Sequence, residues 1–147
     1  MGGKEESMIL IVGGAWQGKL AFAVGLAKKA YPSDSPAFKN EKKEEYEIAE
    51  GSRDSFEAAM KCRIIHGLHE YIRRLLKEGK SVDDFLSAVL QQNPHVIITS
   101  NELGCGIVPM DPGDREWREV SGRASVRLAR TSGEVYRMVC GIASRIK

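Results

Sequence analysis

The feature that most constrains this chain is an apolar strand that runs straight into a glycine-rich loop and then into a helix. Residues 8–12 (MILIV) form a continuous apolar run with β-branched members, as a strand buried on both faces requires. The loop has the spacing G-x-x-x-x-G-K from Gly13 to Lys19, and apolar residues then recur at helical spacing over 20–29. A strand, loop and helix in this order predict an α/β fold with a mostly parallel sheet.

The rest of the chain alternates predicted strands with predicted helices. We expect strands at 46–49, 62–65, 95–100 and 134–141, and helices at 68–78, 83–92 and 114–131. Asp54 or Ser55 caps a short helical turn within 52–60, Gly79 ends one helix, and Ser81 caps the next. The predicted architecture is a P-loop NTPase-like, three-layer sandwich with about five strands. We expect one nucleotide-binding domain over 1–147, with an exposed connector at 31–45.

In this position the glycine loop predicts a phosphate-binding site. Glycines let the backbone curl so that successive N–H groups point at phosphate oxygens, and the N-terminus of the following helix adds partial positive charge. Lys19 supplies a mobile cation for the outer phosphates, which makes it a candidate catalytic residue. The alternative to phosphate binding is a glycine-rich turn in which the lysine has no functional role. The candidate nucleotide-binding residues are Gly13, Gly14, Ala15, Trp16, Gln17, Gly18, Lys19, Leu20 and Glu102.

Leu20 departs from the complete motif, which has Ser or Thr at this position. That hydroxyl binds the Mg²⁺ ion that bridges the β- and γ-phosphates, and a leucine side chain has no oxygen to replace it. Either the metal is held by other groups, or the ligand does not need it, or the site no longer turns over. The sequence leaves the metal ligand unassigned, and phosphate binding survives this change more easily than catalysis does.

Two further candidates lie at strand ends, where the ligand sites of α/β proteins are found. Glu102 could hold a metal-bound water or simply order its loop. His66 could act as a base or a nucleophile, or be structural. We expect His69 and His95 to be structural, since the three histidines share no metal-ligand spacing. Four arginines of the predicted helix 114–131, expected to be solvated or to contact another subunit, are Arg115, Arg118, Arg123 and Arg127.

The composition limits which classes of binding partner and which cellular compartment we expect. Twenty-two Lys and Arg against 20 Asp and Glu leave a net charge of +2, which gives no reason to expect nucleic acid. The three cysteines (Cys62, Cys105 and Cys140) form no CxxC pair and favour a reducing compartment. The polar residues 1–7 and the short apolar run after them predict neither a signal peptide nor a membrane span. We therefore expect a cytoplasmic protein.

The segment 101–109 (NELGCGIVP) is the most specific stretch of the chain. It closely resembles the N-E-[VL]-G-x-G-I-V-P segment of the bifunctional adenosylcobinamide kinase / adenosylcobinamide-phosphate guanylyltransferase family of cobalamin biosynthesis. The similarity continues through 118–123, 127–129 and 134–142, and residues 8–27 look like the opening strand and phosphate loop of that family. Both motifs occur in the family's order.

The resemblance implies an enzyme that uses GTP or ATP to phosphorylate a cobinamide hydroxyl and then transfers GMP from GTP through a guanylylated histidine. Together with the apolar helix faces, it also implies a homo-oligomer. The chain departs from the family at Leu20 (family Ser), at Trp16 and Gln17 (Arg-Ser), and at Ser125 and Val126 (Asn-Gln). The alternative function is therefore a nucleotide-binding or regulatory module without turnover, and a third is a structural protein with a vestigial loop.

Two alignments of the middle of the chain give His66 different roles. In the first, residues 60–66 (MKCRIIH) match the family's histidine context, and His66 is the guanylylated nucleophile. In the second, residues 64–68 are the third strand and its exit, and the histidine segment is absent from a shortened middle. His66 then replaces a carboxylate that contacts the nucleotide. The second agrees better with the hydrophobic pattern, because 62–65 is the only strand candidate between Ala49 and His95.

Overall fold

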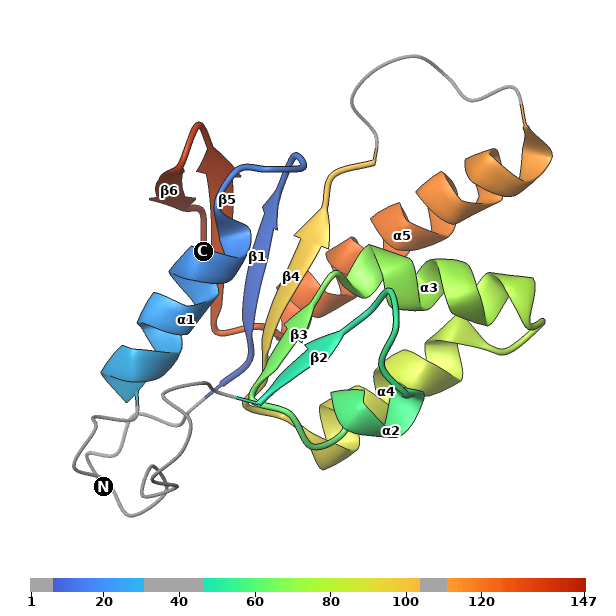
Figure 1. Ribbon diagram of the computed structural model, residues 1–147, viewed down its shortest axis with the longest axis horizontal. Helices are drawn as coiled ribbons and strands as arrows, with labels where there is room; N and C mark the ends of the chain where they lie inside the picture. Colours follow the sequence, from blue (N-terminus) through green and yellow to red (C-terminus); the bar gives the residue numbers. More distant parts are fainter. Residues whose placement is uncertain (1–6, 31–46, 104–110) are drawn as a thin grey trace.

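A central sheet organises the molecule. The computed structural model describes residues 7–30, 47–103 and 111–147. Its sheet has six strands in the order β2-β3-β4-β1-β5-β6 (Figure 1). Neighbouring strands from β2 to β5 are parallel, and only β6 is antiparallel to its neighbour. In chain order the elements are β1 (Ile9–Gly13), α1 (Lys19–Ala30), β2 (Ile48–Glu50), α2 (Phe56–Ala59), β3 (Ile64–His66), α3 (Leu68–Lys77), α4 (Val82–Gln92), β4 (Ile97–Asn101), α5 (Pro112–Thr131), β5 (Glu134–Val139) and β6 (Ile142–Arg145).

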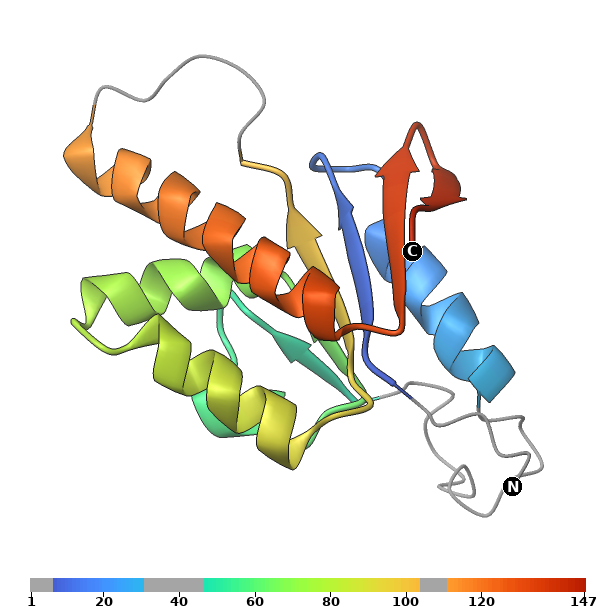
Figure 2. The same cartoon turned by 180° about the vertical axis from the view of Figure 1, so that it is seen from behind.

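Helices cover both faces of the sheet, so the predicted three-layer α/β fold is confirmed. Helix α1 lies on one face, and α3, α4 and α5 lie on the other (Figures 1 and 2). Successive residues of β1 point to opposite faces. Ile11 joins a buried cluster with Ala23 and Ala27 of α1, whereas Leu10 joins the larger cluster beneath α3 and α5. The buried strands are therefore apolar on both sides, as the continuous apolar runs predicted.

Helix ends agree with the residues that the sequence marked. The hydroxyl of Ser55 accepts a hydrogen bond from the backbone N–H of Ala58, so Ser55 caps α2. Asp54 instead accepts from the backbone N–H of Glu50 at the end of β2. Ser81 caps α4 in the same way as Ser55, and Gly79 takes a left-handed φ of 66° just beyond α3.

The C-terminal end of the sheet corrects the sequence prediction. The expected last strand at 134–141 stops at Val139, and a tight turn returns the chain as the additional strand β6. Cys140 and Gly141 both have positive φ (52° and 75°), as the two central residues of a type I′ hairpin turn do. Cysteine is not among the residues that usually signal this turn, so the hairpin was missed.

Two expectations fall outside the described residues. The exposed connector at 31–45 lies wholly within an undescribed segment. So do residues 104–109 of the family-like stretch, which include Cys105. Within the described ranges, no helix is long and apolar enough to cross a membrane.

Two glycines test how tightly the elements pack. A Cβ on Gly51, just after β2, would lie 2.0 Å from the carbonyl oxygen of Gly67, which belongs to the rigid start of α3. We expect Gly51→Ala to lower the free energy of unfolding by 1–3 kcal/mol or more, about the cost of overpacking a core. In the matched control Gly25→Ala, on the exposed face of α1, the new methyl meets open space. Because alanine has a higher helix propensity than glycine, Gly25→Ala should raise the free energy of unfolding by about 0.5–1 kcal/mol. Urea unfolding measures both, and equal stabilities would contradict this packing.

Candidate functional site

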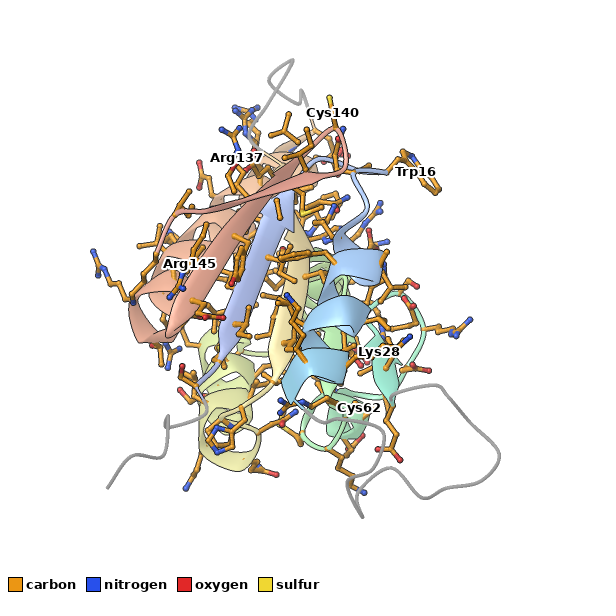
Figure 3. The ribbon with its side chains drawn as sticks, turned by 90° about the vertical axis from the view of Figure 1, so that its left-hand side faces the viewer. Trp16, Lys28, Cys62, Arg137, Cys140 and Arg145 are labelled. Atoms are coloured by element: carbon orange, nitrogen blue, oxygen red, sulfur yellow. The ribbon has the colours of Figure 1, made fainter. Side chains whose placement is uncertain are left out.

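The glycine loop between β1 and α1 is curled tightly against the neighbouring strand. Trp16 and Gly18 both have left-handed φ values, 62° and 84°. A Cβ on Gly13 would lie 2.6 Å from the carbonyl oxygen of Met138 in β5, so only glycine fits where the loop begins. Trp16 is fully exposed and extends away from the body of the molecule (Figure 3). The loop thus has the backbone path that the motif predicts.

Lys19 is folded over this loop. It is the first residue of α1, is only 5% exposed, and donates from Nζ to the carbonyl oxygen of Gly14 at 2.5 Å. Burial lowers the pKa of its ammonium group, while the nearby Glu102 carboxylate raises it. An ammonium group desolvated inside a curled loop at a helix N-terminus is well placed to meet an anion.

Gln17 ties the loop to the β5–β6 hairpin. Its side-chain oxygen Oε1 accepts a hydrogen bond from the backbone N–H of Cys140 at 2.5 Å. A Cβ on Gly18 would lie in ordinary contact with Gly141 of the same turn. The hairpin that the sequence missed therefore supports the predicted phosphate loop.

A cavity of about 380 Å³ opens beside the loop. The carboxyl ends of β2, β3 and β4 border it, as expected for parallel strands that end at one edge of the sheet. Its lining includes the loop from Ala15 to Leu20 and, from the strand ends and α3, Glu50, Ser52, His66, Gly67, His69, Glu70 and Asn101. The structure therefore brings His66 together with the six predicted loop residues from Ala15 to Leu20, whereas Gly13, Gly14 and Glu102 are not among the residues that line this cavity. It adds Glu50, which the sequence did not mark, and Asn101, the first residue of the family-like segment.

His66 lies at the end of β3 with its ring held by Thr99. Nδ1 is 2.6 Å from the Thr99 hydroxyl oxygen, which also accepts from the backbone N–H of Gly67. Burial lowers the pKa of the imidazole, and Lys19 lowers it further, against an opposing effect of Glu50. The ring is therefore neutral near neutral pH. Nε2 has no hydrogen-bond partner within the part of the chain that the structure describes.

We expected His69 to be structural, and its hydrogen bonds hold together the elements that border the cavity. Only 8% exposed, it accepts at Nδ1 from the backbone N–H of Asn101, and its carbonyl oxygen accepts from the indole N–H of Trp117. Burial, aided by Lys19 and His66, lowers its pKa to about 4. His69 thus links α3 to β4 and α5. His95 is exposed and lies before β4, away from the cavity.

Glu102 follows β4 and forms a two-pronged ion pair with Arg137 of β5. The two carboxylate oxygens accept from Nε and Nη2 at 3.0 and 3.2 Å. The backbone N–H of Glu102 also donates to the carbonyl oxygen of Gly13. Glu102 therefore sets the exit of the loop after β4. Arg137 was missed because its nearness depends on β5 pairing with β1, which the sequence does not specify.

Leu20 does not fit the metal that a complete motif would hold. Its side chain is partly buried against the cluster that contains Ile11, Ala23 and Met138, and it supplies no oxygen. Over residues 7–30, 47–103 and 111–147, no three His, Cys, Asp or Glu side chains gather closely enough to hold a metal ion. We therefore assign no metal-dependent step to these residues.

The low pKa of His69 makes stability depend on pH. The unfolded histidine binds a proton near pH 6.5 and the folded one only near pH 4, so protonation favours unfolding as the pH falls between these values. We expect the wild type to lose up to about 3 kcal/mol over this range from His69 alone. In His69→Asn, whose amide oxygen can still accept from Asn101, that loss should disappear. Urea unfolding at pH 7 and pH 4.5 measures the difference, with His95→Gln as the exposed control; parallel pH profiles for all three proteins would contradict this account.

Comparisons with known proteins agree with the resemblance at 95–147. Residues 37–146 match the family model described as cobinamide kinase / cobinamide phosphate guanyltransferase; the match does not extend to the glycine loop. The bifunctional adenosylcobalamin biosynthesis protein CobU of Salmonella typhimurium is 39% identical over 72 residues, which are 46% of this chain and 40% of that protein. CobU of Escherichia coli is 40% identical over 63 residues, 42% of this chain and 35% of that protein.

These alignments span well under half the length of the curated relatives. Among solved structures, the flagellar accessory protein FlaH of Methanocaldococcus jannaschii is similar over 97% of this chain and 78% of its own. Its TM-score is 0.47 at 13% identity, a likeness too distant to bear on function. The family match covers most of the chain, and the chain belongs to the cobinamide kinase / cobinamide phosphate guanyltransferase family.

Proposed function

We propose that this chain binds a nucleoside triphosphate, GTP or ATP, in the glycine loop and acts in the phosphorylation of cobinamide. The observation that carries the proposal is the position of Lys19: a nearly buried ammonium group that bonds the carbonyl oxygen of Gly14, inside a curled loop at the start of α1. Family membership supplies the acceptor, since the family is described by its action on cobinamide.

In this proposal the chain's own groups divide the work. A bound phosphate displaces the carbonyl oxygen of Gly14 as the partner of Lys19, and the charge of Lys19 then offsets that of the phosphate. The backbone N–H groups of the loop and the N-terminus of α1 add further positive potential. His66 borders the same cavity with a neutral ring, so it can accept a proton from an attacking hydroxyl.

A second candidate function, guanylyl transfer, is favoured by the geometry of His66. If the ring carries its proton on Nδ1 and donates it to Thr99, Nε2 has a free electron pair. Nε2 would attack the α-phosphorus of GTP, forming a P–N bond while the bond to the bridging oxygen breaks and diphosphate leaves. A phosphate oxygen of cobinamide phosphate would then attack the same phosphorus and break the P–N bond. Against this role, His66 ends the third strand in chain order, as in the alignment that makes it a nucleotide contact.

The Leu20 substitution supports a third possibility, a module that binds nucleotide without turnover. Nothing at this position can hold the metal between the phosphates. The homo-oligomer implied by the family resemblance is likewise a proposal, which size-exclusion chromatography tests directly.

Nucleotide binding is tested by replacing Lys19. We expect Lys19→Met to weaken GTP or ATP binding about 10- to 100-fold, the range for a lost charged hydrogen bond of 1.5–3 kcal/mol. Lys28→Met, on the exposed last turn of α1, is the matched control and should bind as the wild type does. Isothermal titration calorimetry gives both values. A wild type that binds neither nucleotide would end the proposal.

The role of Leu20 is tested by titrating Mg²⁺ into the same binding experiment. We expect the affinity of the wild type for GTP to be insensitive to Mg²⁺ and that of Leu20→Ser to become sensitive, because serine restores the hydroxyl ligand. An Mg²⁺-dependent wild type would mean that other groups hold the metal. Cobinamide phosphorylation by the wild type that is lost in Lys19→Met would exclude the module without turnover.

Guanylyl transfer is tested by a covalent label. If His66 is the nucleophile, incubation with GTP labelled at the α-phosphate leaves an acid-labile label on the wild type and none on His66→Gln. His95→Gln, which removes an exposed histidine outside the cavity, should label as the wild type does. An unlabelled wild type that still binds GTP would leave His66 as a nucleotide contact.

A further inference from the structure

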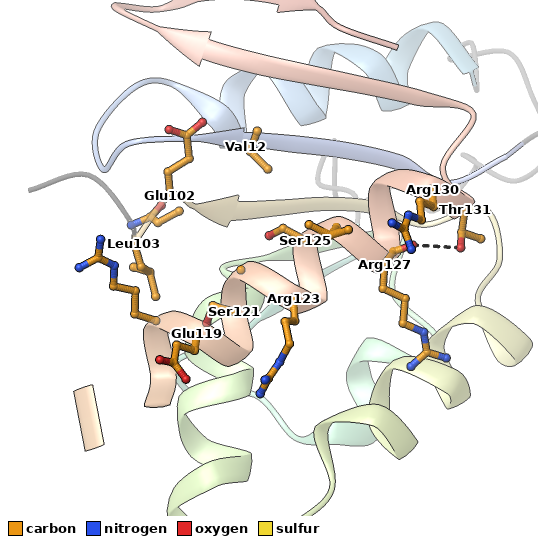
Figure 4. Close-up of a pocket in the computed structure, with 14 residues that line it drawn as sticks. Val12, Glu102, Leu103, Glu119, Ser121, Arg123, Ser125, Arg127, Arg130 and Thr131 are labelled. Atoms are coloured by element: carbon orange, nitrogen blue, oxygen red, sulfur yellow. Dashed lines mark hydrogen bonds between the residues drawn. The ribbon is translucent and has the colours of Figure 1, made fainter. Parts of the chain in front are cut away.

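A second and larger cavity lies on the face of the sheet that α5 covers, between α5 and the ends of β1 and β4. Its volume is about 1250 Å³, compared with about 380 Å³ beside the glycine loop. Pockets for drug-sized ligands usually have about 300–1,000 Å³. We call this cavity the α5 groove; Figure 4 shows its lining, which includes Val12, Asn101, Glu102, Leu103, Gly122 and Ser125.

The α5 groove meets the nucleotide cavity at the end of β4. Asn101 lines both cavities. Glu102, the next residue, lines the groove, and its charge acts on Lys19 inside the glycine loop. A ligand in the groove therefore ends close to the place where Lys19 would hold the outer phosphates.

Part of the lining of the groove is apolar or small, and charged side chains of α5 and Glu102 make up the rest. Val12 and Leu103 line the sheet side, and Gly122, Ser125 and the half-exposed Val126 line the side of α5. Because Gly122 and Ser125 project little from the helix, α5 leaves room for a broad ligand. A Cβ on Gly122 would meet open space.

One hydroxyl in the groove has no protein partner. Ser121 lines it and is only 4% exposed, yet its Oγ has no hydrogen bond among the residues that the structure describes. A buried hydroxyl without a partner is costly, and a ligand that offers a donor or an acceptor would satisfy it. Carboxamide groups offer both.

Four arginines of α5 line the groove: Arg118, Arg123, Arg127 and Arg130. Arg123 and Arg127 extend toward α3 and α4 on the other side of the helix (Figure 4). Arg127 donates to the carbonyl oxygen of Asp83 and to the hydroxyl of Ser87. The groove therefore suits a ligand with an apolar body and with polar groups at its rim that can accept hydrogen bonds from arginine.

We propose that the α5 groove holds the acceptor, a corrinoid alcohol, with its hydroxyl at the Asn101 end; this inference rests on the proposed function. A corrinoid is a broad ring whose rim carries methyl groups and carboxamide side chains, which fit the apolar walls and the unpaired Ser121 hydroxyl. The nucleotide, at the carboxyl edge of the sheet, and the acceptor, between α5 and the sheet, then meet past the end of β4.

The test is to fill the groove and measure the two ligands separately. Gly122→Phe places a ring in the open space of the groove, and Gly25→Phe, on exposed α1, is the matched control. We expect Gly122→Phe to weaken cobinamide binding at least tenfold, measured by equilibrium dialysis with detection at the corrinoid absorbance. Its GTP or ATP affinity should stay within twofold of the wild type, which also shows that it folds. Ser125→Phe serves as a second variant if Gly122→Phe fails to fold.

The outcomes separate this inference from the proposed function. Unchanged cobinamide binding in a folded Gly122→Phe or Ser125→Phe would overturn the groove as the acceptor site while the proposed function stands. A wild type that binds nucleotide but no cobinamide would overturn both. A change of size-exclusion volume in Gly122→Phe, with cobinamide affinity unchanged, would assign the groove to contact between copies of the chain and overturn the proposal as well.

Discussion

The site depends above all on β1 lying in the middle of the sheet, paired in parallel on both sides. Its neighbours β4 and β5 run in the same direction, so Gly13, Asn101 and Met138 end in register at one edge. Gly13 can approach β5 this closely only because it has no side chain. From that edge the chain turns directly into the glycine loop and, on the next strand, into Asn101 and Glu102. One packing arrangement therefore brings Lys19, Glu102 and His66 near one another.

Burial and neighbouring charges shift the pKa values of Lys19, His66 and His69 at this edge. Burial alone lowers the pKa of Lys19, and Glu102 partly restores it. Burial lowers the pKa of both His66 and His69, and the charge of Lys19 lowers them further, so both rings are neutral near neutral pH. In the proposed function, this edge presents one cation for phosphate and one neutral imidazole, whose Nε2 has no hydrogen-bond partner among the described residues. Arg137 is held by Glu102 and leaves Lys19 as the cation inside the loop.

The sequence predicted the parts of this arrangement that rest on local chemistry. A few neighbouring residues predict the strand β1 and the helix caps Ser55 and Ser81, and the structure confirms all three. The sequence could not predict which strands pair. The Glu102–Arg137 ion pair, the place of Asn101 between two cavities and the α5 groove all depend on pairing across long separations. Strand β6 was missed for a local reason, since Cys140 is an unusual residue for a left-handed turn position.

The bond between Gln17 and Cys140 joins residues 123 positions apart, and it sets an order of events during folding. The glycine loop is synthesised before the strand that flanks it and the hairpin that holds it, which come from the 134–145 segment. Contacts between such distant residues carry a large loop-closure cost and form slowly. The loop therefore reaches its final shape only after nearly all of the described chain is available. A ligand that recognises the finished loop would bind a chain whose sheet has already closed.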